Sequence, residues 1–104
     1  MHRIQITPVS NGLQMKEIGK FGVDSGTVMI IDPCYIKDLD NPKFKNCTLD
    51  KLYEQLRDND TATLGKSFAV ASRTGWGDGV YSVYALYDDD RVMGVLIDFG
   101  LDLT

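Results

Sequence analysis

Residues 69–87 read AVASRTGWGDGVYSVYALY, and this stretch decides the fold. Apolar and polar side chains alternate over residues 66–73 and again over residues 80–87, a pattern typical of β-strands. Between these segments, residues 75–79 contain three glycines and the chain's only tryptophan. We expect the glycine-rich segment to be a long hairpin connection between the two strands.

The flanking sequence predicts more antiparallel strands. Residues 91–99 alternate as well, and the three aspartates before them are typical of a solvated turn, so residues 80–87 and 91–99 should pair as a hairpin. Near the N-terminus, residues 3–9 and 13–18 surround Asn11-Gly12, the strongest short-range signal for a β-hairpin. The last third of the chain therefore reads as a β-meander, and a hairpin opens the protein.

One central strand and one helix complete the predicted fold. Residues 27–32, TVMIID, form a continuous apolar run that favours a strand covered on both faces, and Pro33 ends it. Residues 48–59 have a single apolar stripe at helical spacing, with Thr48 as the N-cap. The stripe consists of Leu49, Leu52, Tyr53 and Leu56. We predict one α+β domain over residues 1–104, a predominantly antiparallel, strongly curved sheet of about six strands with this amphipathic helix packed on it.

Composition narrows the function classes. The 104 residues are 43% hydrophobic and 25% charged, with a formal net charge of −4, so duplex nucleic acid is not an expected partner. The longest fully apolar run covers residues 28–31, far short of the roughly 20 residues that a membrane helix needs. The N-terminus lacks the apolar core of a signal peptide. We expect a cytoplasmic protein that does not bind membranes.

Residues for catalysis or for metal binding are few. His2 is the only histidine, and Cys34 and Cys47 do not form a CxxC pair, so we expect neither a zinc site nor a cofactor. Nucleophilic catalysis lacks a base for the same reason. Four carboxylates could hold a divalent cation if the fold brought them together. They are Asp24, Asp32, Asp78 and Asp98.

The glycine-rich segment has two interpretations. It can be a wide turn with a bulge, in which Trp76 folds back over the edge of the core. It can also be a nest, in which successive backbone N–H groups point at one anion, with Trp76 as a stacking lid and Arg73 as the counter-charge. Asp32 likewise either bonds to loop amides or lines a pocket at the sheet edge.

Two motifs resemble an uncharacterised family of small proteins from bacteria and bacteriophages. They are SGTVMIIDPCYI at residues 25–36 and GWGDGVYSVYALYDDDRVMGVLIDF at residues 75–99, although Ser82 stands where the family pattern has proline. The resemblance covers about half of the chain and implies a compact β-rich domain, often encoded by phages or prophages, with no established reaction. The matching positions are Asp32, Cys34, Tyr35, Gly77, Asp78, Gly79, Tyr81 and Asp98.

These observations favour a non-enzymatic protein that binds a small anionic, nucleotide-like ligand, such as a phage protein that sequesters a host defence signal. The predicted ligand-binding residues are Asp32, Cys34, Tyr35, Arg73, Trp76, Gly77, Asp78, Gly79 and Tyr81. A small metal-dependent hydrolase using Asp32, Asp78 and Asp98 is one alternative. A module that binds a host protein through a strand edge is another, and a homo-oligomer is compatible with all three.

Overall fold

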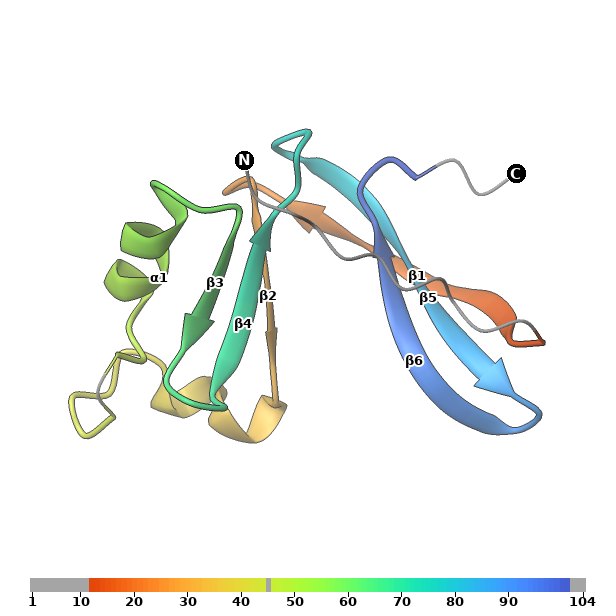
Figure 1. Cartoon of the computed structure of the whole chain (residues 1–104), viewed down its shortest axis with the longest axis horizontal. Coiled ribbons are helices and arrows are strands. Elements are labelled where there is room, and N and C mark those ends of the chain that lie inside the picture. The colour runs from red at the N-terminus through yellow and green to blue at the C-terminus, as the bar shows by residue number, and fades with distance from the viewer. Residues whose placement is uncertain (1–11, 45, 102–104) are drawn as a thin grey trace. The chain divides into compact units, whose positions relative to one another are not determined.

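The computed structural model describes residues 12–44 and 46–101, and the chain divides into two compact units (Figure 1). One unit is the continuous segment 22–80. The other combines segments from both ends of the chain, 1–21 and 81–104. Each unit is built around its own three-stranded sheet. No helix in the described part of the chain has the length and apolar character needed to cross a membrane.

The segment 22–80 is an antiparallel sheet with helical connections. Its strands are β2 (Thr27–Ile31), β4 (Ala69–Arg73) and β3 (Thr61–Leu64), in that order across the sheet. Between β2 and β3 the chain forms the 3-10 helix η1 (Pro33–Asp38) and the helix α1 (Leu49–Leu56). Ile30 lies opposite Val70 and Ala62 opposite Ala71, which fixes the register on both sides of β4.

Helix α1 covers one face of this sheet. Leu52 and Leu56 point from the helix into a core of small and branched residues on β3 and β4, which are Ala62, Leu64, Ala69 and Ala71. Thr48 is the N-cap as predicted, because its Oγ1 accepts a hydrogen bond of 3.1 Å from the amide of Lys51. Tyr53 does not belong to the buried stripe, since it is 45% exposed.

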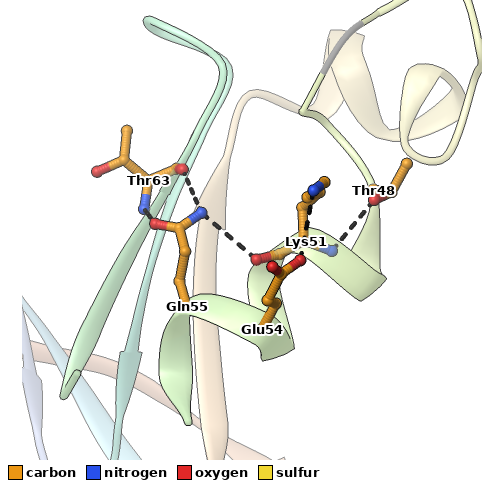
Figure 2. Close-up of polar contacts among 5 residues, drawn as sticks. All are labelled: Thr48, Lys51, Glu54, Gln55 and Thr63. Atoms are coloured by element: carbon orange, nitrogen blue, oxygen red, sulfur yellow. Dashed lines mark hydrogen bonds and ion pairs between the residues drawn. The ribbon is translucent and has the colours of Figure 1, made fainter. Parts of the chain in front are cut away.

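Helix α1 also protects the outer edge of β3 (Figure 2). The side-chain amide of Gln55 donates to the carbonyl of Thr63 at 2.9 Å, and its Oε1 accepts from the amide of Thr63 at 3.1 Å. These two bonds satisfy backbone groups that a neighbouring strand would otherwise pair. Gln55 therefore replaces a fourth strand at this edge.

The other sheet has the order β1-β5-β6, with β1 at Gln14–Val23, β5 at Gly79–Asp88 and β6 at Arg91–Asp98. Strands β5 and β6 form the predicted hairpin, and its tight turn places Asp89 at a φ of 51°. A bulge between Leu86 and Tyr87 shifts the register near the turn. Residues 3–9 of the predicted first hairpin lie outside the described residues.

The prediction of a single curved sheet was wrong, because the six described strands form two sheets. Strand β4 already has β2 and β3 as neighbours, and β5 already has β1 and β6. Neither strand has a free edge for the other, so residues 75–79 cross between two sheets and do not connect a hairpin.

The prediction of a central strand at residues 27–32 was also wrong. Strand β2 lies at an edge of its sheet, and Ile30 is 61% exposed. The short strand β3, which the sequence pattern did not predict, takes the third place in this sheet. Its four residues alternate, with Ala62 and Leu64 buried, but four residues are too few for a firm periodicity signal.

Candidate functional site

The glycine-rich loop between β4 and β5 has the backbone conformation of a nest. Gly75 and Gly77 have φ values of 79° and 80°, while Trp76 between them is not among the described residues with positive φ. Alternation of left-handed and right-handed residues is the geometry from which amide nests form. The indole of Trp76 is 76% exposed, so it does not cover the edge of a core.

Two segments distant in sequence are fastened together at this loop. Thr74 donates its amide to the carbonyl of Gly26 at 3.1 Å, and Gly26 donates its own amide to Asp78 Oδ1 at 2.8 Å. The hydroxyl of Thr74 donates to the carbonyl of Gly77 at 2.7 Å, and only 3% of this threonine is exposed. These bonds, which we call the Gly26 clasp, hold the loop against the turn that precedes β2.

A groove of about 450 Å³ lies beside the clasp, and the glycine loop forms part of its wall. The residues that line it are Ser25, Gly26, Asp60, Arg73, Thr74, Gly75 and Gly77. Arg73 donates its amide to the carbonyl of Asp60 at 2.9 Å and its Nε to the carbonyl of Asn59 at 3.3 Å, which anchors the guanidinium at the wall.

Both the guanidinium and part of the loop have unused donors. Within residues 12–44 and 46–101, Arg73 has no carboxylate at ion-pair distance, since the one ion pair joins Lys51 and Glu54. The amides of Gly75 and Trp76 likewise have no acceptor there. The groove therefore offers a fixed positive charge and unsatisfied N–H groups to a ligand from solution.

The DPCY segment lies elsewhere, at the opposite end of β2. Asp32 caps η1 through a hydrogen bond of 2.9 Å from the amide of Cys34, and the ring of Tyr35 stacks on Phe68 with centroids 5.4 Å apart. Five strand residues separate this end from Gly26, which corresponds to roughly 16 Å at about 3.3 Å per residue. The predicted residues thus form two groups within the segment 22–80.

A second groove, of about 550 Å³, lies at the DPCY end. Asp32, Tyr35 and Lys66 line it together with apolar side chains of β2 and β4. Cys34 carries a free, exposed thiol and is not among the residues that line this groove. Each of the two grooves has one acidic and one basic side chain in its lining, but only the groove beside the clasp also has the positive-φ glycines Gly75 and Gly77.

The remaining predicted residues have structural contacts. Tyr81 is buried, and its ring meets Phe99 edge-on with centroids 5.4 Å apart. Asp98 Oδ1 accepts hydrogen bonds from the amides of Gly100 and Leu101 at 2.8 and 2.6 Å. Gly79 begins β5. Among residues 12–44 and 46–101, no three histidine, cysteine, aspartate or glutamate side chains are grouped so that they could hold a metal ion.

A single family match covers the first sequence motif and all but the last two residues of the second. The family described as "Protein of unknown function (DUF4241)" matches residues 6–97. The chain belongs to this family. No curated protein and no solved structure matches it significantly. The DUF4241 match includes the clasp, the groove beside it and the DPCY segment, whereas Asp98 follows directly after it.

Five groove residues of this DUF4241 chain were not predicted as ligand-binding residues. They are Ser25, Gly26, Asp60, Thr74 and Gly75. Thr74 could have been found, because a threonine directly before a glycine-rich loop commonly bonds to the backbone of that loop. Gly26 and Asp60 reach the groove only through pairing with β4, which depends on contacts distant in sequence.

Proposed function

We propose that this DUF4241 protein binds a small anionic ligand in the groove beside the Gly26 clasp. The observation that carries the proposal is the anchored guanidinium of Arg73, which has no ion-pair partner among the described residues and lines the same groove as Gly75 and Gly77. A fixed arginine can form bidentate hydrogen bonds to phosphate or carboxylate, and the amides of the loop can complete the coordination.

A nucleotide is the ligand class that could contact both the anion-binding groups of the loop and the indole of Trp76. Trp76 directly follows the groove residue Gly75, and its indole is largely exposed to solvent. The indole can therefore stack on a base without leaving the core of the protein. Stacking of a base on an aromatic side chain contributes about 1–3 kcal/mol to binding. Asp60 also lines the groove, and its carboxylate can accept hydrogen bonds from ribose hydroxyls or from a base amine.

In this proposal the protein binds its ligand and does not catalyse a reaction on it. The groove contains no histidine or cysteine, and a sequestering protein needs affinity and slow release but no catalytic group. Capture of a nucleotide-derived defence signal in a phage or prophage setting is the finer form of this proposal. The similarity of the motifs to bacterial and phage proteins supports it.

Calorimetry on the full chain tests the proposal. The protein is titrated with pyrophosphate and with a panel of linear and cyclic nucleotides, and we expect at least one of them to bind at concentrations of about 100 µM or below. If none of them binds in this range, the proposal is wrong.

A second measurement separates binding from hydrolysis. The bound nucleotide is incubated with the protein, released by heat denaturation and analysed by chromatography, with and without Mg²⁺ or Mn²⁺. We expect the nucleotide to return chemically unchanged. A product that depends on the metal ion would instead support the alternative of a hydrolase using Asp32, Asp78 and Asp98.

A further inference from the structure

The two edges of the sheet in segment 22–80 differ in how their outward backbone groups are hydrogen-bonded. At the β3 edge, Gln55 bonds to both backbone groups of Thr63 (Figure 2). At the β2 edge, by contrast, no side chain in the described residues bonds to Met29 or Ile31. The sheet therefore has one blocked edge and one open edge.

The hydrogen bonds at the end of β4 show which groups of β2 face outward. Thr74 donates to Gly26 on the β2 side, whereas Arg73 donates to Asp60 on the β3 side. Because the direction of bonding alternates along an antiparallel strand, Ser72 and Val70 also face β2. Their partners across the ladder are Val28 and Ile30.

It follows that Thr27, Met29 and Ile31 direct their N–H and C=O groups to the open edge. The carbonyl of Thr27 accepts a long bond of 3.3 Å from the hydroxyl of Ser25, which leaves the amide of Thr27 and both groups of Met29 and Ile31 without partners in the described residues. Unpaired groups in a row form a template for another strand.

The open edge also lacks the usual protection against pairing. Natural edge strands carry charged residues, an internal proline or a bulge. Strand β2 reads TVMII, with no charge, no proline and a regular ladder to β4 along its whole length. Ile30 on this strand is largely exposed.

We propose that β2 pairs in antiparallel orientation with β2 of a second copy of the chain, around a two-fold axis at Met29. In this register Met29 lies opposite the partner's Met29, and the two residues form both N–H···O bonds of a hydrogen-bonded pair. Ile31 then faces the partner's Thr27, and Asp32 faces the partner's Gly26, so no like charges oppose each other. The product is a continuous sheet made from two three-stranded sheets.

A second copy suits this edge better than an unrelated peptide. An identical strand centred on Met29 meets every outward N–H and C=O group of β2, and in this register Asp32 faces Gly26, so the copies match without opposing like charges. An uncharged strand also meets no electrostatic penalty against itself, whereas it offers nothing that would select a charged peptide.

The test is the oligomeric state of the full chain at about 100 µM, measured by sedimentation or light scattering. We expect a particle of twice the 11.6 kDa chain mass. Met29→Pro removes an outward amide donor and no hydrogen bond to β4, because Met29 and Ala71 form a non-hydrogen-bonded pair, and it should give a monomer. It also removes a side chain that packs against the core. Circular dichroism verifies that this variant is folded.

Ile30→Lys gives an independent variant for the case that Met29→Pro does not fold. In the proposed dimer, the two added charges lie diagonally across the strand pair, about 7–8 Å apart, and should weaken association at least tenfold. The matched control is Val70→Lys, which adds the same charge on the central strand directly opposite Ile30 and should leave the dimer intact. A wild-type monomer at this concentration, or a dimer unaffected by both edge variants, would overturn the proposal.

Disulfide trapping locates the contact. In a Cys34→Ser background, Met29→Cys should oxidise readily to a covalent dimer, because Cα atoms in a bonded antiparallel pair lie about 5.5 Å apart, within the range for disulfides. Val95→Cys on the edge strand β6 serves as the comparison and should remain monomeric. A disulfide at Val95→Cys with none at Met29→Cys would assign the interface to β6 and refute the pairing of β2.

Discussion

The carboxylate of Asp78 accepts a hydrogen bond of 2.8 Å from the amide of Gly26, a residue 52 positions earlier in the chain. This contact joins the glycine-rich loop to the turn before β2 and holds Gly26, which lines the candidate anion site. Its strength therefore determines how well the groove is organised before a ligand arrives.

Replacement of Asp78 should loosen the clasp. Asp78→Ala leaves the amide of Gly26 without its acceptor, and we expect a loss of about 1–2 kcal/mol in the free energy of unfolding, because hydrogen bonds to charged groups contribute about 1.5–3 kcal/mol. Hydrogen exchange of the Gly26 amide should accelerate. Asp24→Ala is the matched control, since Asp24 is exposed and has no bond in the described structure. Equal exchange rates in the two variants would contradict the role of the clasp.

Replacement of Arg73 should affect ligand binding far more than stability. Arg73→Ala removes the unpaired guanidinium and only one long bond to Asn59, so we expect the Kd for the ligand found by calorimetry to rise about 10- to 100-fold. Arg57→Ala, which removes the same charge from the C-cap of α1, should change the Kd by less than about twofold. If both variants weaken binding equally, the effect reflects net charge and not the groove.

Replacement of Trp76 should separate the contribution of the base of a nucleotide from that of its phosphates. Trp76→Ala removes an exposed indole, so stability should change by less than about 0.5 kcal/mol. The affinity for a nucleotide should fall about 5- to 100-fold, because stacking on the base is lost, while the affinity for pyrophosphate should remain the same. A parallel loss for both ligands would show that the indole supports the loop and does not contact a base.

Replacement of Gln55 should open the edge of β3. Gln55→Ala leaves the N–H and C=O groups of Thr63 unpaired, and we expect a loss of about 1–2 kcal/mol in thermal or urea unfolding. The neighbouring Glu54→Ala removes only an exposed ion pair with Lys51 and should cost less than about 0.5 kcal/mol. Similar losses in both variants would mean that Gln55 acts only through helix propensity.

Local patterns were sufficient to predict much of the fold. The helix that begins after Thr48 and the hairpin of β5 and β6 were predicted correctly, because capping, periodicity and turn residues all lie within a few positions of one another. The choice of neighbours for β4 and β5 was not predictable in this way. It depends on which edges are already occupied, and that depends on β1, β2 and β3 together.

The candidate site was predictable only in part. The residue types of the loop, with Arg73 preceding it and Trp76 within it, are enough to indicate an anion site. The partners of the loop did not follow from the sequence, because Gly26 and Asp60 are brought to it by two different ladders of β4. The predicted site combined the loop with the DPCY segment, whereas β2 separates them.

The Gly26 clasp also determines how the segment 22–80 tolerates changes in its sequence. Gly26 and Asp78 lie close to the two limits of the segment 22–80, so their hydrogen bond closes this segment, which is more than half of the chain, upon itself. In the order of the chain, this segment is an insertion between the two parts of the other unit, 1–21 and 81–104. Variation in its interior, between β2 and β3 above all, can be accommodated without any change in the spacing that the surrounding strands must bridge.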